Sequence, residues 1–213
     1  MAYDLEEQEQ IAALKAWWSK YGTLLLGAVT VLLLSYAAWN GWHWYQREQA
    51  AKASGLYDEL SQAVKAKNAT VVKENTSVLT QKYGRTVFAA LAALRAARMN
   101  HDAGDLAAAQ ENLQWVIDKS GRPEFIPLAR VRLAGVLLDA KSYDAALKAL
   151  DGAVPPEHAV AFADRQGDVL FAMGKIEAAR AAWKSALELA DAQHPLQGLI
   201  QFKLDALPPV EKS

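Results

Sequence analysis

The chain has 213 residues, a formal net charge of -1 and no cysteine, and 52% of its residues are hydrophobic. These values are ordinary for a folded chain of about one domain, and they exclude a disordered or collagen-like polypeptide. A nearly neutral charge gives no overall positive field, so we expect no binding of nucleic acid through its backbone. The lack of cysteine excludes disulfides and thiolate metal sites.

One segment near the N-terminus predicts a membrane-spanning helix. From Tyr21 to Trp42, 22 consecutive residues carry no charged side chain. A helix of that length spans about 33 Å, against a hydrocarbon core of about 30 Å. Aromatic side chains flank the stretch, as is typical of the two membrane interfaces. They are Trp17, Trp18 and Tyr21 at the start, and Trp39, Trp42, Trp44 and Tyr45 at the end.

Two alternatives to an uncleaved membrane anchor are a buried helix of a soluble protein and a cleaved signal peptide. Ser35-Tyr36-Ala37 resembles a cleavage triplet, but the acidic N-terminal tail and the length of the apolar stretch favour the anchor. The count of basic residues does not predict the orientation of the segment in the membrane, because Lys15 and Lys20 precede it while Arg47 and Lys52 follow it. The positive-inside rule therefore leaves the side of the membrane open.

The remainder of the chain predicts helices, because the sequence contains 42 alanines and little strand-like alternation. Glycines that suit helix C-terminal caps are Gly84, Gly104, Gly121, Gly152 and Gly174, and prolines that suit first turns are Pro123, Pro156 and Pro195. We expect helices near 43–67, 69–83, 85–103, 105–119, 123–140, 142–152, 156–173, 175–192 and 195–206.

An apolar pattern recurs three times and predicts a repeat array. Its residues follow the spacing 3, 4, 3, which draws one stripe along a helix. The three sets are Leu106, Ala109, Leu113 and Val116; Tyr143, Ala146, Leu150 and Ala153; and Ile176, Ala179, Trp183 and Ala186. They are displaced by 37 and then 33 residues, a period typical of stacked helix-turn-helix units. The alternative is an unrelated helical bundle with accidental periodicity.

The pattern resembles the tetratricopeptide repeat. Ala109, Ala146 and Ala179 match the family's small residue on the second helix, and Gly104 and Gly174 match its turn. The family's first-helix Trp is absent, and its Leu-Gly pair survives only as Gln166-Gly167, so the repeats are degenerate. The resemblance implies an all-α solenoid over 68–207, with residues 53–90 as an additional, weaker helical pair.

Stacked helix pairs present an extended concave surface to protein partners. The expected groove positions of the three first helices are Leu91, Leu94, Arg98 and His101; Leu128, Val131, Gly135 and Leu138; and Ala161, Asp164, Asp168 and Phe171. We expect part of this strip to contact extended or partly folded polypeptide. Leu128, Val131 and Leu138 are explained slightly better as core than as a binding patch, and both interpretations stay open.

The sequence offers no signature of an enzyme. Its four histidines lie in separate segments, and the common nucleotide-binding loops and the Gly-x-Ser-x-Gly elbow are missing. Asp164 and Asp168 are spaced i, i+4, but such pairs on helices are usually solvated rather than catalytic. We therefore expect no catalytic residue, no metal site and no cofactor.

The N-terminal region carries a second resemblance. An acidic run from Glu6 to Ile11 is followed by Leu14-Lys15-Ala16-Trp17-Trp18 and Tyr21-Gly22, which lead into the apolar stretch, and Lys82-Tyr83-Gly84 precedes a helix rich in Ala and Leu. This arrangement resembles the bacterial YfgM family, the ancillary subunit of the SecYEG translocon. The resemblance implies an inner-membrane, single-pass protein with its tail (1–20) in the cytoplasm, a membrane helix (21–42), a juxtamembrane helix (43–67), periplasmic repeats (68–207) and a short C-terminal tail (208–213).

The same resemblance implies partners: the SecYEG translocon, the periplasmic chaperone PpiD, client polypeptides handed from one to the other, and a cytoplasmic response regulator. The alternative is a membrane-tethered scaffold that organises an envelope complex without binding unfolded chains. A receptor whose repeats face the cytoplasm is a third interpretation.

Overall fold

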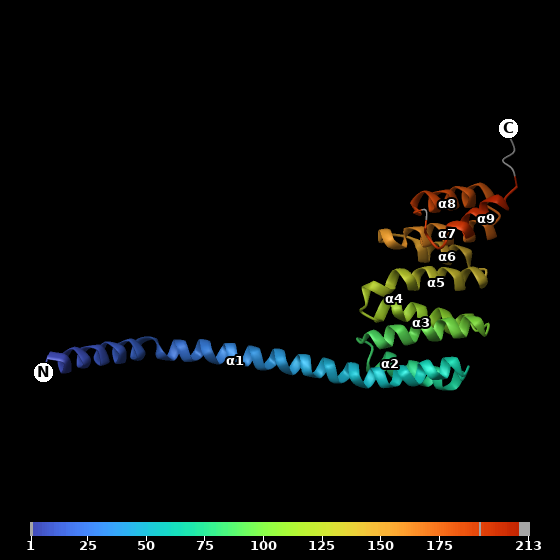
Figure 1. Cartoon of the computed structure of the whole chain (residues 1–213). Helices are drawn as coiled ribbons and strands as arrows, with labels where there is room; N and C mark the ends of the chain where they lie inside the picture. The colour runs from blue at the N-terminus through green and yellow to red at the C-terminus, as the bar shows by residue number, and fades with distance from the viewer. Residues whose placement is uncertain (1, 192, 209–213) are drawn as a thin grey trace. The chain divides into compact units, whose positions relative to one another are not determined.

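The computed structural model describes residues 2–191 and 193–208, and within these residues the chain forms α-helices, two short 3₁₀ turns and no β-strand. The predicted all-helical class is confirmed. The chain divides into two compact units, one up to Gln49 and one from Ala50 onward. Figure 1 shows the order of the helices along the chain.

The first unit is part of helix α1 (Ala2–Lys65). It contains the one helix of the described chain that is long and apolar enough to cross a membrane, and its leucines are exposed, with Leu24 at 74%. The sequence predicted separate helices on the two sides of residue 42, whereas α1 is continuous. The reason is that no proline precedes Pro123, so nothing removes a backbone donor in this stretch. The limits of the tail and of the membrane segment stay predictions.

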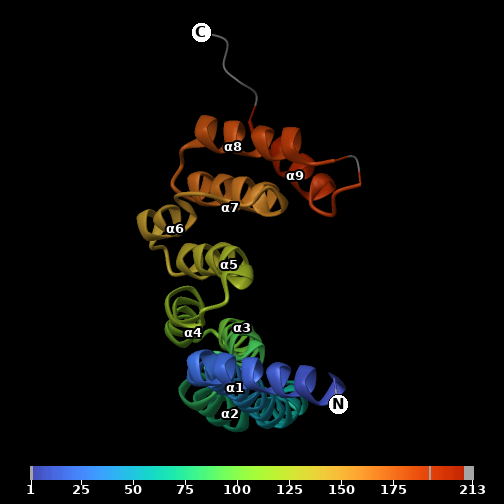
Figure 2. The ribbon, with the colours of Figure 1, turned by 90° about the vertical axis from the view of Figure 1, so that its left-hand side faces the viewer.

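The second unit consists of four helical hairpins and a final helix. The end of α1 pairs with α2 (Ala69–Lys82), α3 (Val87–Asp102) with α4 (Leu106–Lys119), α5 (Ile126–Asp139) with α6 (Tyr143–Leu150), and α7 (Ala159–Ala172) with α8 (Ile176–Leu189). Helix α9 (Gln197–Asp205) packs on α8. The 3₁₀ turns η1 (Pro123–Phe125) and η2 (Pro156–His158) precede α5 and α7. Figure 2 shows the hairpins stacked one on another.

The four hairpin turns share one hydrogen-bond pattern. The amide nitrogens of Asn68, Asp105, Ser142 and Lys175 donate to the carbonyls five residues earlier, of Ala63, Asn100, Leu137 and Leu170. The residue before each donor has a positive φ: Lys67, Gly104, Lys141 and Gly174. This geometry ends a helix by satisfying its last carbonyls. The end of α1 and α2 thus form a hairpin with the same turn as the three repeats. The predicted extra pair of 53–90 overlaps this hairpin, but its last residues belong to α3, which begins at Val87.

Two expected boundary residues differ from prediction. Gly84 has no positive φ, and the C-cap of α2 is Tyr83. Pro195 lies in a turn two residues before α9, whose N-cap is Leu196. The predicted caps at Gly104, Gly121, Gly152 and Gly174 all have positive φ, a conformation that glycine adopts without steric cost.

The predicted apolar stripes form the core between hairpins. Ala109, Leu113 and Val116 are buried against the first helices, as are their counterparts on α6 and α8. Ala153 is the exception, because α6 ends at Leu150 and residue 153 lies exposed in the following loop. Arg130 holds that loop by donating to the carbonyls of Ala149, Asp151 and Ala153.

Candidate protein-interaction surface

The predicted groove residues lie on α3, α5 and α7, the first helices of three hairpins. Their exposure varies widely. Leu94 is 4% exposed and Asp164 is 7% exposed, so little of either side chain is available to a partner. Arg98 and Phe171 are exposed, whereas Leu91, His101, Leu128, Val131, Gly135, Leu138, Ala161 and Asp168 are half-buried.

The apolar part of the strip packs partly into the core. Leu128, Val131 and Leu138 contact the buried cluster formed by the middle hairpins. Phe171 is 48% exposed, and its ring centroid lies 5.8 Å from that of Trp183 on α8. The strip therefore contains both core residues and exposed residues, and a role in binding stays a prediction for each of them.

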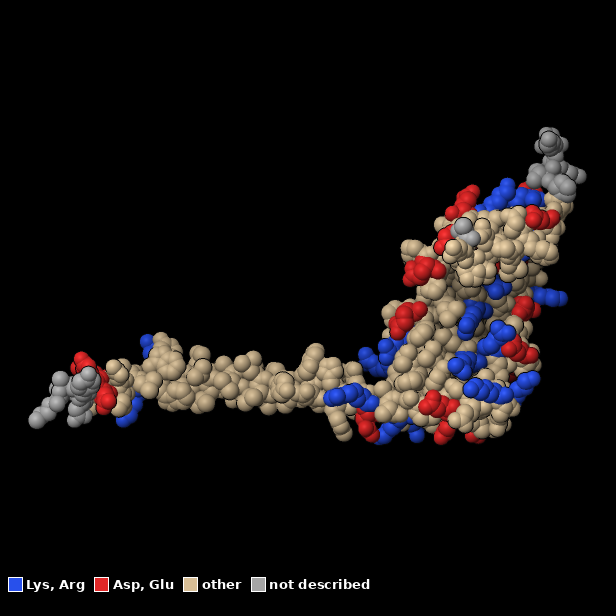
Figure 3. All heavy atoms as spheres, viewed as in Figure 1, with Lys and Arg blue, Asp and Glu red and all other residues tan. Residues whose placement is uncertain are grey.

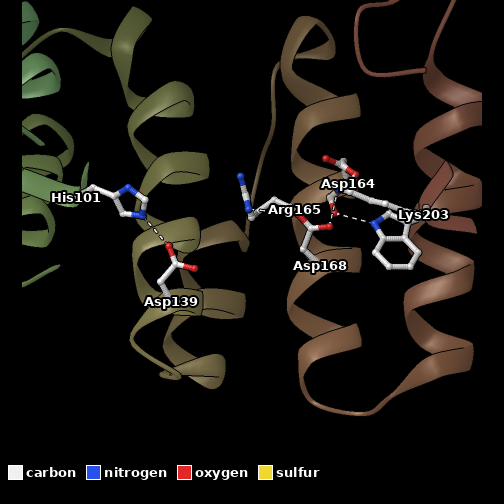
Figure 4. A network of polar contacts seen from close by, with 7 residues as sticks. His101, Asp139, Asp164, Arg165, Asp168 and Lys203 are labelled. Carbon is white, nitrogen blue, oxygen red and sulfur yellow. Dashed lines mark hydrogen bonds and ion pairs between the residues drawn. The ribbon is translucent and has the colours of Figure 1, made fainter. Parts of the chain in front are cut away.

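The two aspartates of α7 are not solvated, in contrast to the expectation from their spacing. The Lys203 Nζ of α9 lies 2.6 Å from a carboxylate oxygen of Asp164 and 2.6 Å from one of Asp168. Figure 4 shows the lysine reaching between them. Helix α9 thus covers this part of α7, which sequence periodicity does not predict because α9 lies outside the repeats.

Burial raises the pKa of Asp168 above its ordinary value, and the repulsion from Asp164 adds to this effect. The hydrogen bond from Lys203, its charge and the charge of Arg165 act in the opposite direction. The pKa is raised because the loss of hydration outweighs the attraction of these cations. Keeping the Asp168 carboxylate charged in the folded protein therefore costs free energy. Such a buried, bridged pair is explained by the packing of α9 without any catalytic role.

Ion pairs also join neighbouring first helices. His101 Nε2 of α3 lies 2.6 Å from a carboxylate oxygen of Asp139 on α5. Figure 4 shows this contact between the two helices. Arg98 is paired with Asp102 one turn along α3, at 2.8 Å, and this arginine lowers the pKa of the Asp102 carboxyl. Two of the predicted groove residues therefore already have partners within the chain.

Sequence analysis missed three arginines on these helices. Arg95, Arg132 and Arg165 are displaced by 37 and then 33 residues, the offsets that relate the apolar stripes. Extending the internal comparison from the second helices to the first would have found them.

A hollow of about 820 Å³ lies on the other side of the repeats, between α2 and α4. Its lining includes Thr76, Asn100, Asn112 and Trp115. The Thr76 hydroxyl is buried there without a hydrogen-bond partner in the described residues. Among residues 6–191 and 193–208, no group of three or more His, Asp or Glu side chains is placed to hold a metal ion.

Comparison with known proteins relates this fold to a family. A family model described as a tetratricopeptide repeat-like domain matches residues 15–209. A curated protein of Neisseria gonorrhoeae (strain ATCC 700825 / FA 1090), named ancillary SecYEG translocon subunit, is 34% identical over 211 residues, which cover 97% of this chain and 100% of that protein. The chain belongs to this family, the YfgM family.

Two further relatives carry the same name. The protein of Escherichia coli (strain K12) is 26% identical over 204 residues, which cover 94% of this chain and 96% of the relative. The protein of Haemophilus influenzae (strain ATCC 51907 / DSM 11121 / KW20 / Rd) is 32% identical over 110 residues, about half of each chain, at 52% and 53%. No solved structure matches the chain.

Membership of the YfgM family agrees with both predicted resemblances. The repeat-like model and the four equivalent turns confirm a tetratricopeptide-like array and remove the alternative of an unrelated bundle. Membrane association follows from the family together with the exposed apolar helix found among residues 2–191 and 193–208.

Proposed function

We propose that this YfgM-family chain is a membrane-anchored protein-interaction subunit of the SecYEG translocon. The observation that carries the proposal is the similarity over the whole length to relatives named ancillary SecYEG translocon subunit. The architecture supports it, because an apolar helix anchors the chain and a stack of helical hairpins offers an extended face to other proteins. The proposed activity is binding, without catalysis.

In this proposal α1 crosses the bacterial inner membrane once, with the N-terminus in the cytoplasm and the repeats in the periplasm. Trp17 and Trp18 lie at one interface, and Trp39, Trp42 and Trp44 lie at the other. The exposure of these rings supports this arrangement, since each is at least 47% exposed. A periplasm-active reporter fused after residue 213 tests it, and activity of a cytoplasmic reporter at that position contradicts it.

The finer part of the proposal concerns partners. The repeats receive clients that emerge from the translocon and pass them to a periplasmic chaperone such as PpiD. The acidic tail meets a cytoplasmic response regulator. Phe171 supports contact with an apolar client segment, because its ring lies on a first helix and is 48% exposed.

One observation favours the alternative of a scaffold that binds only folded partners. Most apolar groove positions on α3 and α5 are buried or half-buried, so these helices present little continuous apolar surface to an unfolded chain. A denatured client distinguishes the two roles: a chaperone-like subunit suppresses its aggregation, and a scaffold does not.

The experiment for the proposed function is crosslinking in native membranes, mild solubilisation, affinity purification through the C-terminus and mass spectrometry. Recovery of translocon subunits and a periplasmic chaperone supports the proposal. A set of envelope proteins without the translocon contradicts it.

Matched variants connect this recovery to the first-helix face. Leu138→Asp and Phe171→Asp should weaken partner recovery. Leu189→Asp on α8 should not; this leucine is 55% exposed, similar to Phe171 at 48%. If Leu138→Asp and Phe171→Asp instead lower the melting temperature strongly, the two side chains belong to the core.

A further inference from the structure

Three arginines occupy one position in successive first helices. Arg95, Arg132 and Arg165 are separated by 37 and 33 residues, as are the turns at Asp105, Ser142 and Lys175. Equivalent positions of stacked repeats lie on the same face, so the three arginines form a row across α3, α5 and α7. Figure 3 shows Lys and Arg atoms on one face of the repeat unit, interspersed with Asp and Glu atoms.

Two arginines of this row, Arg95 and Arg165, lie against the preceding first helix. The Arg95 guanidinium carbon lies 5.2 Å from the ring centroid of Tyr57 near the end of α1. The Arg165 guanidinium carbon lies 3.4 Å from the position of a β-carbon on Gly135 of α5. Burial and the positive charge of Arg98 on α3 together lower the pKa of Arg132. The row is therefore continuous from one hairpin to the next.

The charge of the row is only partly neutralised. Among the described residues, no carboxylate forms an ion pair with Arg95 or Arg132. Arg165 lies 3.2 Å from Asp168, but that aspartate also binds Lys203 at 2.6 Å. The Arg165 Nε is buried without a hydrogen-bond partner in the described part of the chain. Arg95 and Arg132 are exposed and have no carboxylate partner among the described residues, so their guanidinium groups are available to an anionic ligand.

We propose that this row binds an extended acidic segment of a partner protein, with a carboxylate at every third residue. Helices packed side by side are about 10 Å apart. An extended chain in the polyproline II conformation advances about 3.1 Å per residue with three residues per turn, so every third side chain lies on the same face. Three residues of the partner therefore span the distance between neighbouring arginines. Guanidinium groups bind carboxylates through paired hydrogen bonds. The inference deepens the proposed function, on which it rests, because it names the chemistry of one partner segment.

Fluorescence anisotropy with the full chain in detergent tests the row. The probe is a labelled peptide of about twelve residues with Glu at every third position between Gly and Ser, and the control peptide has the same composition with its Glu residues adjacent. We expect the spaced peptide to bind at least about fivefold more tightly. Raising the salt from about 50 mM to about 300 mM should weaken its binding.

Paired variants assign the binding to these arginines. Arg95→Gln with Arg132→Gln should weaken binding of the spaced peptide about tenfold or more. Arg85→Gln with Lys148→Gln removes the same charge from exposed positions outside the row and should change the affinity less than about twofold. Circular dichroism and thermal melting check that each variant is folded. The single variant Arg132→Glu is a second test, and it should also weaken binding of the spaced peptide.

Equal affinity for the two peptides, or unchanged affinity in Arg95→Gln with Arg132→Gln, overturns the proposal. Arginine-dependent binding to vesicles that contain phosphatidylglycerol, without preference between the peptides, overturns it in favour of a lipid surface. Recovery of translocon subunits is scored separately. Register-dependent peptide binding without translocon recovery contradicts only the proposed function.

Discussion

The indole of Trp183 on α8 packs directly on Gly167 of α7. A β-carbon on Gly167 would lie 2.4 Å from both Cδ1 and Nε1 of Trp183, and Nε1 donates a hydrogen bond to the carbonyl of Asp164 at 3.1 Å. The corresponding pairs in the two preceding hairpins are Ala134 with Leu150 and Ala97 with Leu113. The last repeat thus combines a larger second-helix side chain with a smaller first-helix residue.

Gly167→Ala should destabilise the protein by about 2–3 kcal/mol, because the added methyl group forces the indole out of its place. Adding Trp183→Leu should recover much of this loss, since the double variant has the Ala and Leu of the other hairpins. Urea unfolding of both single variants and the double variant measures the coupling. Additive losses would contradict the proposed complementarity.

Arg130 should contribute more to stability than its neighbour Arg132. It donates to three backbone carbonyls after α6, and its guanidinium carbon lies 4.8 Å from the ring centroid of Phe162. Arg130→Met keeps the aliphatic contact but removes the donors, and we expect a loss of about 2–3 kcal/mol. Arg132→Met is the matched control, because Arg132 has no ion pair in the described chain, and it should stay within about 0.5 kcal/mol. Chemical denaturation distinguishes the two variants.

Lys141 should be less favourable than glycine in its turn. Its φ is +57°, whereas glycine occupies the equivalent positions 104 and 174. Lys141→Gly should raise stability by about 0.5–1 kcal/mol, because the left-handed conformation is strained for a residue with a β-carbon. Gly174→Lys, the reverse exchange, should lower it by about 1 kcal/mol. Thermal melting of the two variants should shift in opposite directions, and a shift in the same direction would exclude this explanation.

Asp168 and Asp102 should affect the pH dependence of stability with opposite signs. The pKa of Asp168 is raised above its ordinary value of 3.8, so the native state binds more protons than the unfolded state and stability falls as the pH rises through this window. Asp168→Asn removes this effect, so its stability relative to the natural chain should increase as the pH rises from 3.8.

The pKa of Asp102 is lowered from 3.8, so its contribution is present above that value and is lost as the pH falls through the lowered pKa. Asp102→Asn should therefore lose stability relative to the natural chain as the pH rises through this lower window. Urea unfolding at a series of acidic pH values measures both differences. Parallel profiles for the two variants would show that neither shift acts on folding.

The repeats could be predicted from sequence because their signals are local. Leu106, Ala109 and Leu113 recur at helical spacing, and the residues between hairpins ended the helices where expected. Ala153 was assigned to a stripe wrongly, because spacing alone does not reveal that α6 ends at Leu150. The contact of Lys203 with α7 depends on how α9 folds back on the last hairpin, a tertiary relationship that no repeat encodes.

The groove was predicted only in part for a similar reason. The repeat period and the turn residues of the hairpins locate the first helices. They do not determine how much of each side chain is covered by neighbouring helices. Leu94 and Asp164 lie at groove positions by register and are nevertheless buried. The positions of charged residues relative to the repeat period depend only on sequence. Comparing them between repeats would have located the row from Arg95 to Arg165.

Site-specific photocrosslinking in native membranes tests the central claim most directly, that the first-helix face of a membrane-anchored repeat array contacts the translocon. A photoreactive residue at Phe171 on α7 is compared with one at Leu189 on α8, positions with similar exposure of 48% and 55%. We predict adducts with translocon subunits or their bound chaperone from position 171 and not from 189. Equal adducts from both positions, or none that contains a translocon subunit, would contradict the account.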